Sequence, residues 1–260
     1  MPKFAANLSM LWPELDMYDR FSAAADAGFS RIEILFVHTL DLGRVEPLLR
    51  DLHLELMLFD PAPGDWEAGE RGLACNPGRR DEFQRTLREA LDTAQRLGVR
   101  RLNALTGIPG PGITDDVAHK TIVENYSWAA ELAAPLGISL LVENINTTDM
   151  PGFYVSTVER AAKVVTDVAK PNVRVQLDQY HVGMMGGDAR AELRQHKDLI
   201  EHVQIADVPG RHEPGTGKQP IADFLSELDA LGYSGAVGLE YRPSGATDAA
   251  LAWLPRDQRG

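Results

Sequence analysis

The chain has 260 residues, of which 44% are hydrophobic and 25% charged, as in an ordinary globular protein. Its 38 acidic and 26 basic residues give a net charge of −12, which opposes binding to phosphate backbones and anionic membranes. The single cysteine, Cys75, excludes a disulfide framework or a cysteine-based metal cluster and fits a reducing compartment. No apolar run approaches the ~18–20 residues that span a bilayer. We therefore expect a cytoplasmic protein that binds neither nucleic acid nor membrane.

Eight short apolar runs rich in β-forming residues recur along the chain, and longer amphipathic stretches typical of helices lie between them. The predicted strands begin near Phe4, Arg31, Leu54, Arg101, Ser139, Val173, Glu201 and Ala236. The predicted helices cover residues 15–27, 45–52, 80–97, 115–136, 157–168, 189–199 and 221–231. Left-handed helix caps, which favour glycine, are expected at Gly28, Gly98, Gly137 and Gly232.

Eight strand–helix units in 260 residues match a (β/α)₈ barrel, which typically has ~250 residues. An open doubly wound sheet is the alternative, but it usually carries a Gly-rich turn after its first strand, and the segment ANLSML at 6–11 has none. No Pro- or Ser-rich linker divides the chain, so we predict an α/β protein in which residues 1–260 form a single TIM-barrel domain. Long loops at about 61–79 and 209–219 follow the third and seventh strands, where barrel active sites lie.

Polar residues stand at the ends of the last four predicted strands. They are Glu143, Asp178, Gln204 and Glu240. One such residue often just emerges into solvent, but the carboxyl ends of neighbouring barrel strands converge, and a buried carboxylate is costly unless paired or metal-bound. Because three carboxylates and an amide oxygen suit a hard cation, we predict that the four hold Mg²⁺ or Mn²⁺. Glu143 and Glu240 can also act as acid and base in a proton transfer.

Six segments between Phe4 and Pro243 carry more specific motifs. They are ANLSMLW at 6–12, PGDWEAGERG at 63–72, VENIN at 142–146, QLDQYH at 176–181, HVQIADVPGRHEPGTG at 202–217 and GLEYRP at 238–243. With these motifs the chain resembles the hydroxypyruvate isomerase family, within the xylose isomerase-like sugar isomerases and epimerases. The resemblance implies a TIM barrel, a metal at the four strand-end positions, and Glu143 and Glu240 as proton donor and acceptor.

The resemblance also implies two substrate-binding residues. His181, otherwise read as a structural hydrogen-bonding residue, would contact the substrate or a metal-bound oxygen. Arg211, in the loop after the seventh strand, would pair with a substrate carboxylate, which a guanidinium suits, although a loop arginine is usually solvated. Two positions depart from the expected patterns: Gln204 stands where related sugar 3-epimerases place a histidine, and Asp60 where we expect a family asparagine.

These residues together predict an isomerase that interconverts hydroxypyruvate and tartronate semialdehyde through an enediolate, so the substrate is a small anionic 2-oxo acid. A 2-oxo-tetronate isomerase and a ketose 3-epimerase are alternatives with the same site, the latter disfavoured by Gln204. An apurinic-site endonuclease shares this barrel but needs a histidine-rich zinc site and a basic face. A non-catalytic sugar-acid binding protein would be expected to lack one of the glutamates. Trp66 and Glu70 fit either a lid or loop packing, and a homodimer is an expectation from the family alone.

Overall fold

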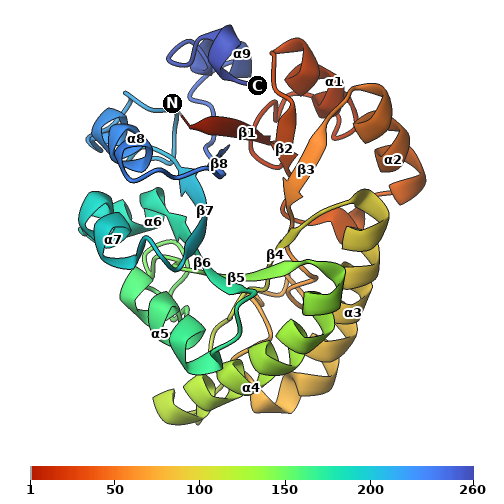
Figure 1. Cartoon of the computed structure of the whole chain (residues 1–260), viewed down its shortest axis with the longest axis vertical. Coiled ribbons are helices and arrows are strands. Elements are labelled where there is room, and N and C mark those ends of the chain that lie inside the picture. Colours follow the sequence, from red (N-terminus) through yellow and green to blue (C-terminus); the bar gives the residue numbers. More distant parts are fainter. Residues whose placement is uncertain (1) are drawn as a thin grey trace.

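The computed structural model describes residues 2–260 as a ring of eight parallel strands surrounded by helices (Figure 1). The strands are β1 (Lys3–Asn7), β2 (Arg31–Glu33), β3 (Glu55–Leu58), β4 (Arg101–Asn103), β5 (Ser139–Glu143), β6 (Val173–Asp178), β7 (Ile200–Ile205) and β8 (Ala236–Leu239). Hydrogen bonding joins them in the order β3-β2-β1-β8-β7-β6-β5-β4. A parallel bridge between Phe59 and Leu102 brings the β3 and β4 edges together. The predicted TIM barrel is thus confirmed, and all eight strands lie where the sequence indicated.

Helices cover the outside of this ring (Figure 1). The α-helices are α1 (Asp19–Asp26), α2 (Leu42–Asp51), α3 (Arg80–Leu97), α4 (Asp115–Ala133), α5 (Val158–Val168), α6 (Gln179–Met184), α7 (Ala189–His196), α8 (Ile221–Ala230) and α9 (Thr247–Ala250). Short 3₁₀ turns are η1 (Val37–Thr39), η2 (Pro77–Arg79), η3 (Ala134–Leu136) and η4 (Arg256–Gln258). The last helix, α9, lies close to both chain termini in Figure 1.

All seven predicted helices are present, with differences at their ends. α3 has the predicted bounds, whereas α1 begins only at Asp19 because hydrogen-bonded turns occupy the residues between Trp12 and that position. The predicted helix 115–136 ends as an α-helix at Ala133 and continues as η3. The four predicted cap glycines all have positive φ angles. The sequence analysis missed α6 and α9, since helices of six and four residues are too short to show a helical period.

Strand side chains alternate between two packing environments, as the pleat requires. In β5, Leu140 and Val142 belong to the large cluster of buried residues shared by strands and helices. Leu141 points the other way, into a small separate cluster inside the barrel. Its members are Ala5, Met57, Leu58, Leu141 and Ala236. The barrel interior is therefore apolar over this part of its length.

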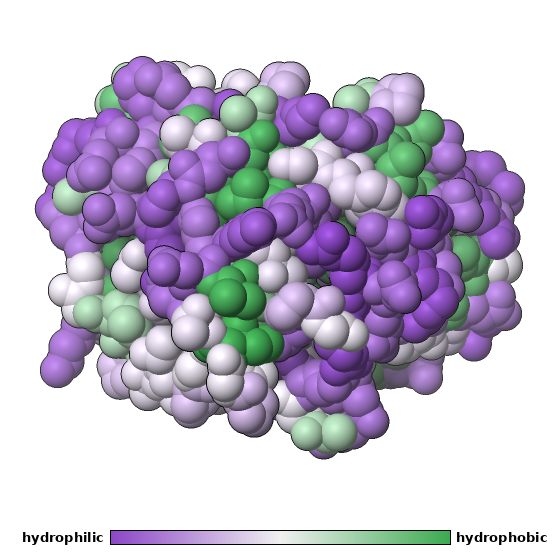
Figure 2. Space-filling model, turned by 90° about the horizontal axis from the view of Figure 1, so that it is seen from below, coloured by the Kyte–Doolittle hydropathy of each residue, from purple (hydrophilic) through white to green (hydrophobic). Residues whose placement is uncertain are grey.

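The outer surface is mostly hydrophilic on the face shown in Figure 2, in keeping with the net charge of −12. Hydrophobic side chains appear on that face as small patches among polar ones. Within residues 2–260, no helix is long and apolar enough to cross a membrane.

Tyr126 of α4 ties the helix layer to the barrel. Its buried hydroxyl donates to the carbonyl oxygen of Ala104 and lies 3.0 Å from that of Leu141. Tyr126→Phe removes this donor, so we expect the free energy of unfolding to fall by about 1–3 kcal/mol. Denaturant unfolding measures the loss. In the control Tyr154→Phe the lost hydroxyl donates to one carbonyl, that of exposed Asp115, and equal losses in both variants would contradict the prediction.

Candidate active site

A polar side chain stands within two residues of the carboxyl end of every strand, and all eight are buried. They are Asn7, Glu33, Asp60, Asn103, Glu143, Asp178, Gln204 and Glu240, which we call the polar ring. Gln204 on β7 donates to Glu33 on β2 at 3.0 Å across the barrel, since these strands are not neighbours. The sequence analysis assigned roles only to the members that follow β5–β8. Of the other four, Asn7, Glu33 and Asn103 lie inside the predicted apolar runs and Asp60 follows one, so the sequence alone did not mark them as a set at the strand ends.

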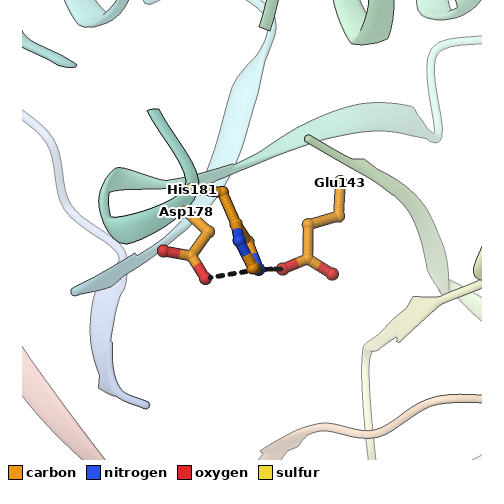
Figure 3. Close-up of side chains that lie close together, drawn as sticks. All are labelled: Glu143, Asp178 and His181. Atoms are coloured by element: carbon orange, nitrogen blue, oxygen red, sulfur yellow. Dashed lines mark ion pairs between the residues drawn. The ribbon is translucent and has the colours of Figure 1, made fainter. Parts of the chain in front are cut away.

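Glu143, Asp178 and His181 come together at the carboxyl ends of β5 and β6 (Figure 3). His181 Nε2 lies 3.3 Å from Asp178 Oδ2 and 3.9 Å from Glu143 Oε1. One ligand-type atom from each residue lies within 4.8 Å of the other two. The histidine ring therefore stands between two buried carboxylates, in a group that could hold a metal ion.

Asn144, the third residue of VENIN, positions Asp178. Its amide donates to the Asp178 carbonyl oxygen at 3.1 Å and accepts from the Asp178 N–H at 3.2 Å. The Asp178 carboxylate then caps α6, because its Oδ1 accepts from the Tyr180 N–H at 2.8 Å. Asp178 and His181 are thus oriented by the same short helix.

Asn146 determines which nitrogen of His181 carries the proton. Asn146 Oδ1 accepts from the N–H groups of Thr148 and Asp149 at 3.0 and 2.8 Å, so its Nδ2 faces His181 Nδ1, 2.6 Å away. Because an amide nitrogen can only donate, Nδ1 is the acceptor and the ring proton lies on Nε2. Burial, together with nearby Arg211, lowers the pKa of His181 well below its usual value. His181 therefore presents a neutral Nε2–H donor, which suits a substrate oxygen.

Arg211 reaches the polar ring from the loop after β7. Its Nη2 lies 2.8 Å from Glu240 Oε1 and 3.3 Å from Asp178 Oδ2. Its φ of 56° is uncommon for a non-glycine residue and typical of constrained functional loops. Within residues 2–260, no hydrogen bond engages Arg211 Nη1. The predicted carboxylate-binding residue thus pairs with two ring carboxylates and keeps part of its guanidinium free.

Asp207 organises the loop that carries Arg211, a role that the sequence analysis did not identify. Its buried carboxylate accepts four backbone hydrogen bonds of 2.8–3.0 Å, from Val208, Gly215, Gly217 and Gln219. Bonds to an ionised acceptor are stronger than bonds between neutral groups. The long loop predicted after the seventh strand is therefore tied at several points to one side chain.

Gln204 is held by partners inside the barrel. Its oxygen accepts from Gln176 Nε2 at 2.6 Å, and its nitrogen donates to Glu33 Oε2 at 3.0 Å. Glu33 Oε1 lies 2.6 Å from His202 Nε2, although the pair is not aligned for a hydrogen bond. Gly238 leaves room for Glu33, because a Cβ there would lie 2.4 Å from both carboxylate oxygens. No hydrogen bond in the described chain joins Gln204 to the other three predicted ligands, but its oxygen keeps a second lone pair.

In the loop after β3, Trp66 packs against Phe36 of the segment after β2, and Glu70 pairs with Arg79 at the end of the loop. The Trp66 ring centroid lies 4.9 Å from that of Phe36 and 4.1 Å from the guanidinium carbon of Arg71. Glu70 pairs with both terminal nitrogens of Arg79. These contacts give Trp66 and Glu70 a packing role in this loop.

The carboxyl groups of the polar ring repel one another when they are ionised. Burial raises the pKa of Glu240 to about 8 and that of Asp178 to about 6, and Arg211 offsets part of each rise. Burial and then the charges of Glu240 and Asp178 raise the pKa of Glu143 well above its usual value. The folded protein thus resists placing a full negative charge on each carboxyl group.

This donor set fits a divalent cation. Five ring members are carboxylates, at Glu33, Asp60, Glu143, Asp178 and Glu240. Among residues 2–260, Arg211 is the only arginine or lysine that forms an ion pair with any of them. A hard cation with oxygen ligands would neutralise part of this charge. The chemistry of the donors therefore agrees with the predicted metal.

Comparison with known proteins identifies the family. The xylose isomerase-like TIM barrel family matches residues 21–256. A 2-oxo-tetronate isomerase of Cupriavidus necator is 40% identical, and a hydroxypyruvate isomerase of Escherichia coli 39%, each over 98% of both chains. The chain belongs to the hydroxypyruvate isomerase family of these barrels. It is thus an isomerase, as predicted. A solved Brucella melitensis structure, named AP endonuclease, family 2, is 42% identical over 98% of both chains, with a TM-score of 0.95.

The ring of His181 should carry its proton on Nε2. In ¹⁵N NMR of the metal-free protein, we expect a protonated Nε2 and an unprotonated Nδ1, with no change between about pH 8 and pH 6.5 because the pKa is depressed. Asn146→Asp should reverse this tautomer, since a carboxylate accepts from an Nδ1–H. A proton on Nδ1 in the unmodified protein would show that Asn146 does not set the tautomer.

The metal-free protein should lose stability as the pH rises. The folded-state pKa values of about 8 for Glu240 and about 6 for Asp178 exceed the unfolded values of about 4. Between these limits the folded state holds more protons than the unfolded state, so the free energy of unfolding falls with increasing pH. Denaturant unfolding with a chelator from about pH 5 to pH 8 measures the fall.

Two additions sharpen this pH experiment. Mg²⁺ or Mn²⁺ should restore stability near pH 8, because a bound cation favours the ionised carboxylates. Glu240→Gln, which cannot ionise, should make the pH dependence shallower. A metal-free protein that becomes more stable from about pH 5 to pH 8 would refute the charge assignment.

Proposed function

We propose that the protein isomerises a short 2-oxo acid with a hydroxyl group on C3, of which hydroxypyruvate, converted to tartronate semialdehyde, is the simplest. The observation that carries this proposal is the pair of buried glutamates, Glu143 after β5 and Glu240 after β8, on two sides of Asp178 and Arg211. Two carboxyl groups with raised pKa values are suited to exchange protons with carbon near neutral pH.

The reaction moves one carbon-bound proton. One glutamate takes a proton from C3, which leaves an enediolate shared by C2 and C3. The other glutamate delivers a proton to C2, and the hydroxyl proton passes from O3 to O2, so that the ketone becomes the aldehyde without any change in composition. Glu143 and Glu240 stand on different strands, so each can serve a different face of the substrate.

A divalent cation, Mg²⁺ or Mn²⁺, would stabilise the developing negative charge as a Lewis acid. Its proposed ligands are Glu143, Asp178, Gln204 and Glu240. The free Nη1 of Arg211 is available for the substrate carboxylate, and His181 Nε2–H is available for a substrate oxygen. The substrate would then be held at its charged end by one residue and at its reacting end by another.

The alternatives differ in substrate. A 2-oxo-tetronate isomerase would use the same groups, and a ketose 3-epimerase would lack a carboxylate for Arg211. DNA repair, suggested by the name of the similar Brucella melitensis protein, is opposed by the net charge of −12 and by a candidate metal group with one histidine. A purely binding role is opposed by the presence of both glutamates. Assays of hydroxypyruvate, 2-oxo-tetronate, ketoses and apurinic DNA with Mg²⁺ or Mn²⁺ decide among them.

Glu143→Gln and Glu240→Gln should each lower kcat for hydroxypyruvate by ~10²-fold or more at saturating metal, the usual scale for a lost acid or base. Glu55→Gln is the control, because Glu55 is exposed at the opposite end of β3. In D₂O the aldehyde product should acquire deuterium at C2, as measured by NMR. Full activity of either site variant removes that glutamate from the mechanism.

A further inference from the structure

Three oxygens of the polar ring have no hydrogen-bond partner within the described chain, and two of them, on Asp60 and Asn103, lie at the ends of adjacent strands, whereas the third, Glu33 Oε1, faces His202. Asp60, two residues beyond β3, is 3% exposed, and Asn103, the last residue of β4, is 1% exposed. Asp60 Oδ1 and Asn103 Oδ1 make no hydrogen bond to any residue in the range 2–260. Buried polar atoms nearly always have a partner, so two such atoms on adjacent strand ends point to a ligand that the protein itself does not supply.

The nitrogen of the Asn103 amide is already engaged. Asn103 Nδ2 donates to Glu143 Oε2 at 2.6 Å, which orients the amide and leaves its oxygen as the free group. The same amide lies close enough to Asp60 to offset part of the rise that burial and the charges of Glu240 and Glu33 cause in the Asp60 pKa. The free atoms at Asp60 and Asn103 are thus both carbonyl- or carboxyl-type oxygens, which accept hydrogen bonds from hydroxyl groups.

The position of the pair indicates which part of a substrate it meets. In the closed ring of strands, β3 lies opposite β7 and β4 lies opposite β8 (Figure 1). Arg211, in the loop after β7, pairs with Glu240, which follows β8. A 2-oxo acid whose carboxylate meets Arg211 therefore extends its other end toward Asp60 and Asn103, past Glu143 and Glu240.

Hydroxypyruvate and 2-oxo-tetronate differ at that end. Both carry the carboxylate, the C2 carbonyl and the C3 hydroxyl that the proposed reaction requires. The four-carbon acid adds a hydroxymethyl group on C3, which supplies one further hydroxyl donor. The three-carbon acid has no hydroxyl group beyond C3 that could donate to a further buried acceptor.

We propose that Asp60 and Asn103 form a hydroxyl-binding subsite for the C4 hydroxyl group of a four-carbon 2-oxo acid, so that this acid is preferred over hydroxypyruvate. This inference rests on the proposed function, and it assigns a specificity role to the β3–β4 side of the polar ring. Asp60 accepts the hydroxyl at Oδ1. Asn103, whose Nδ2 donates to Glu143, links the subsite to the proton-transfer group.

The first test compares kcat/KM for 2-oxo-tetronate and hydroxypyruvate in the unmodified protein with Mg²⁺ or Mn²⁺. A site built to bond a hydroxyl rejects the analogue without it, so we expect a preference of roughly tenfold or more for the four-carbon acid. Equal values, or a preference for hydroxypyruvate, overturn the inference and leave the isomerase proposal standing. Turnover of neither acid overturns the proposed function instead.

Two variants of Asp60 test whether this residue causes the preference for the four-carbon acid. Asp60→Leu has a similar shape but no acceptor, and the ratio of the two kcat/KM values should fall by roughly tenfold. Asp60→Asn keeps an acceptor oxygen, so it should retain most of the ratio. A ratio that Asp60→Leu leaves unchanged places the recognition elsewhere and overturns the inference. Asn103 is not used as the primary probe, because its substitution would also release Glu143.

A binding experiment tests the subsite without turnover. Threonate and glycerate carry a carboxylate and hydroxyl groups on four and three carbons, and neither has a carbonyl group to isomerise. Calorimetry should show tighter binding of threonate by roughly tenfold in the unmodified protein and in Asp60→Asn, and no such difference in Asp60→Leu. Equal affinities of the unmodified protein for the two acids would overturn the subsite, whether or not the protein proves to be the proposed isomerase.

Discussion

The dominant constraint on this molecule is the burial of five carboxyl groups at one end of a narrow barrel. Glu33, Asp60, Glu143, Asp178 and Glu240 all lie in the polar ring. Their mutual repulsion and loss of hydration would destabilise the fold if all were ionised. Arg211 pairs with two of these groups, and amides donate hydrogen bonds to individual oxygens. The pKa values of Glu143, Asp178 and Glu240 are also raised, which favours their neutral forms.

Several polar side chains hold these groups in place through hydrogen bonds. Asn144 fixes the backbone of Asp178, Asn146 orients His181, and Asn103 donates to Glu143. Asp207 ties down the loop from which Arg211 enters. Each of these residues acts on a group that carries charge or a proton, so the site is pre-organised by its own side-chain hydrogen bonds.

The sequence was sufficient to predict the barrel, because most strands and helices have a local signature, namely an apolar run or a capped amphipathic stretch. It also predicted Glu143, Asp178, Gln204 and Glu240 as neighbours, since strand ends converge in a barrel. It did not reveal the short helix α6, because six residues carry no period. The roles of Glu33 and Asp207 were equally hidden, since their partners, Gln204 and the backbone of residues 208–219, are defined only in three dimensions.

Two parts of the polar ring differ in chemistry. The residues at the ends of β5–β8 include the candidate metal and proton-transfer groups and contact Arg211, whereas Asp60 and Asn103, at the ends of β3 and β4, each keep one oxygen without a hydrogen-bond partner in the described chain. In the proposed subsite Asp60 would contact the end of the substrate, whereas Asn103 also donates to Glu143 and so couples this side of the ring to the proton transfer. Isomerases named for two different acids are each about 40% identical to this chain. Overall identity averages over the whole barrel, whereas under the proposal the choice between three and four carbons would depend on the ends of two strands.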